Sequence, residues 1–349
     1  MKICVIGSGF FGLHVASQLK KKVRNCSLDV FESKSSPFTG AAFNNQCRLH
    51  LGFHYPRSGY TIYQSVLGFD RFRSEYPVVC NPIASNFYAI HKDGYVSAEN
   101  YFAVMDSFHL DYSEQKIPSF FKNKSNIEAV IKVPEQWINL KSLRNQLLSF
   151  VSENIKCDST VSEVCPKSGK VFVNGRLYDE YDLVINATYT NPNIGATKPF
   201  YELKYELAAL VNCETSFNKD TAVTVMDGPF VSIYPSSTNT HTLSSVLYTP
   251  HVNCNSVSEL SAYVRKGLDI SAKASVSDKI INHVSEFIDL KIGKQSMWLS
   301  TKVKLASDYG DSRVTQVKRE GKLVSVLCGK LDAVFEASDN IMQGLNYDL

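Results

Sequence analysis

The sequence lacks the signatures of several large enzyme classes. Its nine cysteines include no C-x-x-C pair, and neither a G-x-S-x-G elbow nor a G-x-x-x-x-G-K-[ST] phosphate loop is present. The eight histidines and the cysteines show no spacing typical of a zinc site. These absences argue against a metalloenzyme, an α/β-hydrolase and a P-loop nucleotidase.

The sequence also lacks a large excess of positive or negative charge. The net charge is only +3, and the chain has no block of like charges and no low-complexity stretch. This composition gives no support for a nucleic-acid or membrane surface, so we expect a small-molecule substrate as the partner. The odd number of scattered cysteines fits reduced thiols and predicts a cytoplasmic protein.

Long uninterrupted apolar runs are also missing. The most apolar segment, Ile3 to Leu19, is interrupted by three glycines and by polar residues. Its basic cluster, Lys20 to Lys22, follows the apolar stretch, whereas a signal peptide carries its charge first. We therefore expect neither a signal peptide nor a membrane span in this segment.

The N-terminus does contain a glycine motif between a strand and a helix. Residues 2–6 are typical of a short buried strand, and residues 11–19 carry apolar side chains at helical spacing. Between them, Gly7, Gly9 and Gly12 form G-x-G-x-x-G. Such glycines permit a tight turn, the approach of a pyrophosphate to the backbone and close helix packing. The free N–H groups of the helix N-terminus favour an anion at the same place.

A second predicted strand, residues 27–31, ends at Glu32, which lies 20 residues after Gly12. A carboxylate at this position accepts hydrogen bonds from a ribose hydroxyl and repels the 2′-phosphate of NADP. Strand, glycine turn, helix, second strand and terminal acid together predict a dinucleotide-binding Rossmann domain. The alternative is a glycine-rich turn without a ligand.

Two later segments favour FAD over NAD as the dinucleotide. Residues 182–188 begin 150 residues after Glu32 and form a buried strand that ends in Ala187-Thr188. A simple NAD dehydrogenase would keep its Rossmann units contiguous, whereas two-lobed flavoproteins separate them. Residues 329–332 open the last predicted helix, whose N-terminal dipole would stabilise charge on a reduced flavin. We therefore predict FAD as the cofactor.

The remaining chain mixes strands and helices without an internal repeat, and its aromatic-rich segment 53–121 either walls a pocket or fills a core. We expect helices at 61–73, 97–108, 139–151, 257–267, 276–289 and 331–342. We expect strands at 86–91, 94–97, 170–173, 183–186, 222–226, 230–234, 241–249 and 323–328.

The sequence resembles the D-amino-acid-oxidase-like FAD-dependent oxidoreductases, the group of glycine oxidase and 2-hydroxyglutarate oxidase. The residues that carry the resemblance are Gly7, Gly9, Gly12, Glu32, His50-Leu51-Gly52-Phe53-His54-Tyr55, Asn186-Ala187-Thr188, Arg313 and Gly329-Lys330-Leu331-Asp332. It implies an α/β protein, α+β overall, with a Rossmann-type FAD-binding domain and a mainly antiparallel substrate domain. The implied FAD-binding domain is discontinuous, with residues 1–60, 135–195 and 300–349, and the substrate domain comprises residues 61–134 and 196–299.

The resemblance also implies FAD contacts spread over the chain. Residues 39–46 would run along the pyrophosphate and ribityl chain, and the run from His50 to Tyr55 would reach the isoalloxazine ring. The full set of expected FAD contacts is Gly7, Ser8, Gly9, Phe10, Phe11, Gly12, Glu32, Ser33, Gly40, Ala41, Arg48, Leu49, His50, Val161, Ala187, Thr188, Gly329, Lys330, Leu331 and Asp332.

The residues expected to carry catalysis are His50, His54, Tyr55 and Arg313. By resemblance, Arg313 would project from a late strand towards a substrate carboxylate, which a guanidinium binds in a bidentate manner. Either histidine could polarise flavin or substrate, act as a base or carry a covalent flavin link. Both could equally be polar anchors of a loop packed on the cofactor. Arg48, Arg57 and Arg313 are candidates for an anionic substrate, or else surface or ion-paired side chains.

Two positions depart from the family pattern. Cys328 stands where the family often has the first of two glycines before the last helix, and Val314 follows Arg313 where the family has proline. The first departure loosens the expected flavin contact at residues 329–332, and the second weakens the role expected for Arg313.

The predicted function is that of an FAD-dependent oxidoreductase. It would oxidise a C–N or C–OH bond of a small, anionic substrate by hydride transfer to flavin N5. Two alternatives remain. A non-redox flavoenzyme similar to the UDP-galactopyranose mutases would act on a nucleotide sugar without an electron acceptor. A non-catalytic FAD-binding protein would keep the fold and serve as a binding partner.

Overall fold

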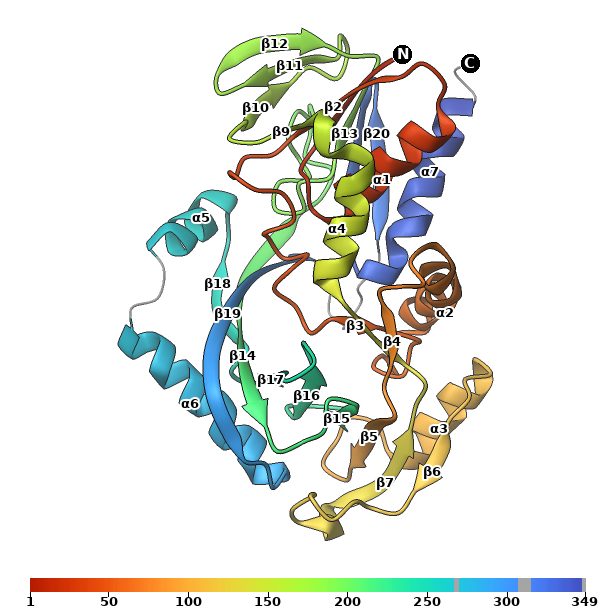
Figure 1. Ribbon diagram of the computed structural model, residues 1–349, viewed down its shortest axis with the longest axis vertical. Helices are drawn as coiled ribbons and strands as arrows, with labels where there is room; N and C mark the ends of the chain where they lie inside the picture. The colour runs from red at the N-terminus through yellow and green to blue at the C-terminus, as the bar shows by residue number, and fades with distance from the viewer. Residues whose placement is uncertain (267–269, 307–314, 347–349) are drawn as a thin grey trace.

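A computed structural model of the protein describes residues 1–266, 270–306 and 315–346. Figure 1 shows an elongated molecule whose upper half is a sheet flanked by helices and whose lower half is built around long, curved strands. We call these the Rossmann half and the large-sheet half.

The strands of the Rossmann sheet come from three distant parts of the sequence. They are β1 (Lys2–Ile6), β2 (Ser27–Phe31), β9 (Ile155–Lys156), β13 (Leu183–Asn186), β20 (Gln316–Glu320) and β21 (Leu323–Leu327). Over the described residues, their order is β20-β21-β13-β1-β2-β9, and all neighbours except β20 and β21 pair in parallel. Parallel sheets are covered on both faces, which explains why β1 and β13 consist almost entirely of apolar residues. The strands predicted at 2–6, 27–31 and 183–186 are confirmed.

One face of this sheet is covered by helices. They are α1 (Phe10–Lys22), α4 (Leu140–Val151) and α7 (Val334–Asn346), which follows the 3₁₀ turn η3 (Leu331–Ala333). α1 packs against α4 and α7 over an apolar core that includes Leu13, Leu143 and Ile341. Asn139 begins α4 because its side chain accepts a hydrogen bond from the Ser142 amide at 3.1 Å. Figure 1 shows the three helices side by side.

α2 (Gly59–Glu75) packs against η3 and α7. Gly68 permits this contact, because a Cβ at that position would lie 2.3 Å from the carbonyl oxygen of Asp332. The helix thereby ties the segment after residue 50 to the start of the C-terminal helix.

Two small sheets complete this part of the molecule. One is the meander of β10 (Val161–Val164), β11 (Lys170–Val173) and β12 (Arg176–Glu180), and the other joins β3 (Arg48–Leu49), β8 (Gln136–Ile138) and β4 (Cys80–Pro82). The meander packs through Val161 and Val171 on Cys4, Ile6 and Phe31. β3 brings the segment that follows the glycine turn next to the large-sheet half.

The large sheet is mainly antiparallel. Its strands are β5 (Ser85–His91), β6 (Ser113–Gln115), β7 (Ile127–Lys132), β14 (Leu203–Thr215), β15 (Thr221–Met226), β16 (Val231–Pro235), β17 (His241–Ser245), β18 (Pro250–Cys254) and β19 (Ile292–Leu305). In the described chain the order is β18-β14-β17-β16-β15-β5-β7-β6, with β19 also paired to β14, and only β5 and β15 are parallel neighbours. The remaining elements are α3 (Ala98–Ser107), α5 (Val257–Lys266), α6 (Ile270–Phe287) and the turns η1 (Lys124–Asn126) and η2 (Ser152–Asn154).

α6 covers one face of the large sheet. Its Ile280 and Val284 pack on Val223, Ile233 and Leu243 of three neighbouring strands. Because side chains alternate along a strand, the residues between these apolar positions point to the opposite face, towards the Rossmann half.

The predicted strand at 94–97 is wrong. The Gly94 amide donates to the His91 carbonyl at 2.9 Å, and the Tyr95 amide donates to the Asp227 carbonyl at 2.6 Å. The backbone groups of this segment are therefore used in a turn and a loop contact instead of a ladder. The strand predicted at 241–249 ends at Ser245, and the helix predicted at 276–289 begins at Ile270 and ends at Phe287.

The domain boundaries remain a prediction, and two elements bear on them. α2 lies in the range assigned to the substrate domain but packs on α7, and β19 crosses the boundary at residue 300. None of the helices in the described ranges is long and apolar enough to cross a membrane.

Candidate active site

At two of its three glycines, the glycine turn is built by backbone contacts that leave no room for a side chain. Gly7 has φ = +96°, and a Cβ there would lie 2.8 Å from the Ala187 carbonyl oxygen. A Cβ at Gly12 would lie 1.9 Å from the Gly7 carbonyl oxygen. The turn thus brings Ala187 and Thr188, which follow β13, directly beside the N-terminus of α1.

Glu32 is held against this turn by short hydrogen bonds. Its Oε2 accepts from the Ser8 amide at 3.1 Å and from the Ser8 hydroxyl at 2.6 Å. Its Oε1 accepts from the Lys34 amide at 3.0 Å and faces the Ser33 hydroxyl at 3.4 Å. A carboxylate has about four acceptor sites and these four contacts use them, so a ribose hydroxyl would bind Glu32 by replacing one of them.

The turn fits a bound dinucleotide. Gly9 is the N-cap of α1, no side chain caps this helix end, and a Cβ at Gly9 would meet no atom within 4 Å. The first N–H groups of a helix have no intrahelical acceptor, so at this end of α1 they can donate to an anion at the positive end of the helix dipole. Gly40 is equally open.

Several predicted cofactor contacts have their side chains elsewhere. Phe10, Phe11 and Leu49 are buried in the core of the Rossmann half, and Val161 of the meander is buried in the cluster with Cys4 and Phe31. Any contact of these residues with a cofactor would have to come from their backbone atoms. The Ala41 carbonyl accepts from the Asn45 side chain at 3.1 Å and so shapes the segment after the turn.

The run from His50 to Tyr55 forms a cluster of rings. The His50 ring centroid lies 5.7 Å from that of His54 and 5.3 Å from that of Tyr55. The Lys330 ammonium lies 5.0 Å from the Tyr55 ring centroid. The structure thus brings two segments together that are 275 residues apart, as residue numbers 55 and 330 show.

Lys330 is a buried cation beside this cluster. Its ammonium donates to the Thr61 carbonyl at 3.0 Å and to the Ser65 hydroxyl, and it lies 3.5 Å from Asp332 Oδ2. Burial lowers the pKa of Lys330, and the Asp332 carboxylate opposes that shift. Gly329 precedes it with its amide bonded to Thr315 at 2.9 Å, and Leu331 is half-buried.

Arg48 is a second buried cation, with only 6% of its surface exposed. Its Nη1 donates to Thr224 Oγ1 at 2.9 Å and to the Tyr88 hydroxyl at 3.3 Å, and its guanidinium lies 4.3 Å above the Tyr234 ring. Its Nε and Nη2 are buried without a hydrogen-bond partner within the described part of the chain. A buried unpaired donor costs free energy, so this arrangement favours an anionic ligand.

Arg48 lies over a row of hydroxyls on the large sheet, which the sequence did not reveal. Tyr88, Thr224, Ser232 and Ser244 are successive register partners on β5, β15, β16 and β17. This hydroxyl row lies on the face opposite α6, and Gln46 contacts it by donating to Ser232 at 3.0 Å. It forms the large-sheet wall of the candidate active site.

Sequence reasoning also missed Glu135. This carboxylate is fully buried and lies 3.7 Å from His50 Nδ1. It lies five residues before the start of α4, and no periodic pattern marks it in the sequence.

The two remaining arginine candidates differ in outcome. Arg57 Nε is paired with Asp227 Oδ2 at 2.5 Å, and its guanidinium lies 5.1 Å from the Tyr95 ring centroid. This is the ion-paired alternative considered for it. Arg313 lies outside the described residues.

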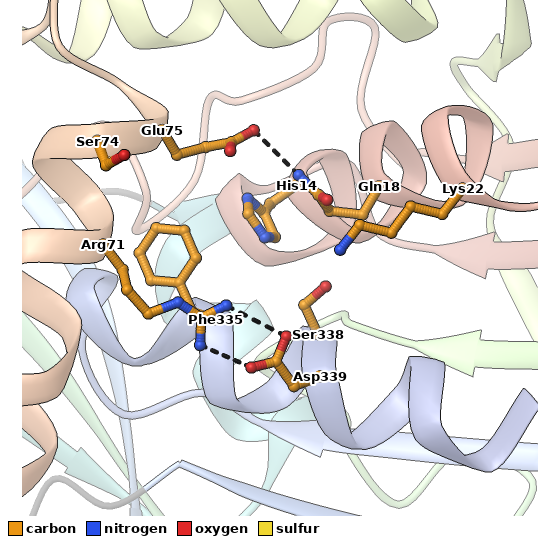
Figure 2. A pocket seen from close by; sticks show the side chains of 9 residues that line it. All are labelled: His14, Gln18, Lys22, Arg71, Ser74, Glu75, Phe335, Ser338 and Asp339. Carbon is orange, nitrogen blue, oxygen red and sulfur yellow. Dashed lines mark hydrogen bonds and ion pairs between the residues drawn. The ribbon is translucent and has the colours of Figure 1, made fainter. Parts of the chain in front are cut away.

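A separate polar cleft of about 170 Å³ lies among α1, α2 and α7 (Figure 2). The Arg71–Asp339 ion pair, with an N–O distance of 2.6 Å, and the Gln18–Glu75 hydrogen bond of 3.0 Å connect its walls. His14 lines it from α1, and burial lowers the pKa of this imidazole to about 3. No residue predicted for cofactor binding or catalysis lines this cleft, so we do not assign the active site to it.

The fold and the glycine turn define a class, the Rossmann proteins with a second, mainly antiparallel half. Residues 5–67 match the family described as NAD(P)-binding Rossmann-like domain. Glycine oxidase from Geobacillus kaustophilus has a similar fold, with a TM-score of 0.70, 10% identity and coverage of 96% of this chain and 92% of that chain. The FAD-bound L-α-glycerophosphate oxidase from Mycoplasma pneumoniae gives a TM-score of 0.74, 12% identity and coverage of 99% and 94%.

A relative by sequence makes the assignment narrower. The FAD-dependent monooxygenase FPY4 of Fusarium mangiferae is 30% identical over 346 residues, which cover 97% of this chain and 89% of that protein. The FAD-dependent monooxygenase kojA of Aspergillus flavus is 43% identical over 58 residues, which are 17% of this chain and 13% of that protein. The chain belongs to the family of FAD-dependent oxidoreductases, and it is an enzyme. The predicted family, fold class and FAD cofactor are confirmed. The alternative of a non-catalytic FAD-binding protein is wrong, because the chain belongs to a family of enzymes.

Proposed function

We propose that the protein oxidises a C–N or C–OH bond of a small, anionic substrate by hydride transfer to FAD. The observation that carries this proposal is Arg48, a buried guanidinium with two unpartnered nitrogens beside the hydroxyl row. A carboxylate or similar anion would satisfy both nitrogens in a bidentate contact.

The cofactor would be held by the glycine turn. The N–H groups at the start of α1 would bind the pyrophosphate, Glu32 would bind a ribose, and Ala187 and Thr188 would line the same site. Residues 329–332 would approach the flavin from the C-terminal side. Bound FAD would supply the acceptor for a hydride, because no protein side chain can take up two electrons in this way.

The side chains of the His50 cluster would then manage the proton. Oxidation of an amine or alcohol carbon releases a hydride from carbon and a proton from nitrogen or oxygen. His50 or His54 would accept that proton, since imidazole is the side chain suited to this transfer near neutral pH. Tyr55 and the buried ammonium of Lys330 would shape the same wall.

Oxygen insertion is the second candidate, because the relative that matches most of the chain is named a monooxygenase. That reaction consumes molecular oxygen and two further electrons from a reductant such as a nicotinamide. It places one oxygen atom in the substrate and releases the other as water.

The test is anaerobic mixing of the purified FAD-loaded protein with a panel of amino acids and hydroxy acids. Loss of the visible flavin absorption by one of them supports hydride transfer. No bleaching by the panel, but substrate-dependent consumption of NADPH and incorporation of ¹⁸O from ¹⁸O₂, supports the monooxygenase. Isomerisation of a nucleotide sugar without any electron acceptor would replace both with a mutase.

A further inference from the structure

Three groups from distant parts of the sequence lie around the carboxylate of Glu135. The carboxylate has no exposed surface, and it lies on the segment between β7 and β8. Its Oε1 accepts from the Leu51 amide at 2.8 Å, and its Oε2 accepts from the Tyr88 hydroxyl at 2.6 Å. Oε1 also lies 3.7 Å from His50 Nδ1, a buried nitrogen that makes no hydrogen bond within the described part of the chain.

The surroundings favour the ionised form of this carboxylate. Burial alone raises the pKa of Glu135, but His50 and the hydrogen bonds from Tyr88 and Leu51 outweigh it and hold the pKa below its usual range. A buried carboxylate is costly unless hydrogen bonds satisfy it, and here the Leu51 amide and the Tyr88 hydroxyl each donate one.

The same contacts connect the substrate wall to the ring cluster. Arg48 donates to the Tyr88 hydroxyl, Tyr88 donates to Glu135, and Glu135 faces His50. This series of contacts begins at Arg48, the proposed anion-binding guanidinium, and ends at His50, the proposed base. Glu135 has no other role in the proposed reaction, and it does not lie in the hydrophobic core clusters.

We propose that Glu135 is a positioning residue that holds the proton of neutral His50 on Nδ1 and so leaves Nε2 as the acceptor. A carboxylate beside one ring nitrogen fixes the tautomer and the orientation of an imidazole. The role of His50 as base rests on the proposed function, whereas its tautomer does not.

The first experiment is ¹⁵N NMR of the histidine side chains in the FAD-loaded protein, with the His50 signal assigned by its loss in His50→Gln. We expect wild-type His50 to carry its proton on Nδ1. Glu135→Gln removes the negative charge beside His50 Nδ1 and leaves one acceptor oxygen, which the Leu51 amide also needs. We therefore expect His50 to lose its preference for the Nδ1 proton. Glu114→Gln, an exposed glutamate on β6, is the matched control and should leave the signal unchanged.

The second measurement is rapid anaerobic reduction by the substrate found in the panel. We expect Glu135→Gln to slow the reduction step by about 100-fold, because a misplaced proton disables a base, while the substrate dissociation constant changes less than about 3-fold. Tyr88→Phe, which removes one hydrogen bond and keeps the carboxylate, should give a smaller loss of the same kind. This variant also tests the proposal if Glu135→Gln fails to fold.

The outcomes separate the two proposals. An Nδ1 proton that persists on His50 in Glu135→Gln and Tyr88→Phe, with an unchanged reduction rate, overturns the role of Glu135 while substrate oxidation stands. A changed tautomer without bleaching by any tested substrate supports the role of Glu135 and contradicts the proposed function.

Discussion

The two walls of the candidate active site are specified in different ways. At the glycine turn, the geometry is set by backbone atoms of residues 7–12 and 187, and the side chains point away into the core. At the hydroxyl row and the His50 cluster, the geometry is set by side-chain contacts among segments near residues 48, 88, 135, 224 and 330. The first wall leaves no room for a side chain at Gly7 and Gly12, and the second depends on charges that must find partners. We therefore expect substitutions to break the fold at the first wall and the chemistry at the second.

The largest effect should follow from Gly12→Ala. Its Cβ would lie 1.9 Å from the Gly7 carbonyl oxygen, so α1 cannot stay in place. We expect a loss in the free energy of unfolding of more than about 4 kcal/mol, measured by urea unfolding. Gly9→Ala in the same turn is the matched variant, because its Cβ meets no atom. It should cost about 1 kcal/mol or less but lower the FAD content, since the methyl would stand where the pyrophosphate is expected.

This pair of variants also tests the comparison itself. Equal stability losses at the two positions would mean that the turn tolerates no side chain anywhere and would remove the evidence for open space at Gly9. Full FAD content in Gly9→Ala would contradict the placement of the pyrophosphate at this helix end.

The second effect is a pH dependence of stability that belongs to the Rossmann half. Burial lowers the pKa of His14 to about 3, from an ordinary value near 6.5. Between these values the unfolded chain binds a proton that the native chain does not, so stability falls as pH falls. The slope is at most about 1.4 kcal/mol per pH unit, or about 2–3 kcal/mol between pH 7.5 and 4.5.

His14→Asn isolates this contribution, because its side-chain oxygen can still accept from the Tyr76 hydroxyl that His14 contacts at 2.5 Å. Urea unfolding at both pH values should show a smaller loss in the variant than in the wild type. Burial also lowers the pKa of His91, His241 and His283, so part of the slope should remain. An identical slope in both proteins would assign the acid sensitivity to those residues instead.

The third effect concerns the second wall. Arg48→Lys keeps the charge but cannot make a bidentate contact with an anion. We expect KM for the substrate to rise about 10- to 100-fold, which is about 1.4–2.7 kcal/mol, with unchanged FAD content. Arg71→Lys, at a half-exposed arginine that lines the separate cleft, should leave KM unchanged. Loss of FAD from Arg48→Lys with an unchanged KM would assign this guanidinium to the cofactor.

This difference between the walls also explains what the sequence could predict. The glycine turn, Glu32 and the flanking strands are close in sequence and follow local rules, so their positions were predicted to the residue. The hydroxyl row needs the register of four strands, which is set by tertiary pairing. β14 and β19 were not predicted, because β14 contains an apolar run, Leu207 to Val211, that is equally consistent with a buried helix.

Glu135 shows the limit most clearly. A single acid between Pro134 and Gln136 carries no pattern, and its importance depends on contacts with Tyr88 and His50, which are 47 and 85 residues away in sequence. By contrast, Lys330 was predicted to lie at the flavin because the resemblance includes its neighbours. The structure adds its burial and its contacts with Thr61 and Ser65.

The smallest effect should follow from Arg71→Ala in the cleft of Figure 2. The Arg71–Asp339 pair is bidentate, with distances of 2.6 and 3.2 Å, but both side chains are close to half exposed. Solvent screens such pairs, so a double-mutant cycle with Asp339→Ala should give a coupling of at most about 1 kcal/mol. Turnover and FAD content should stay at wild-type values, because the cleft shares no residue with either wall. A fall in turnover at unchanged stability would show that the active site depends on the contact between α2 and α7. The two walls alone would then not account for the activity.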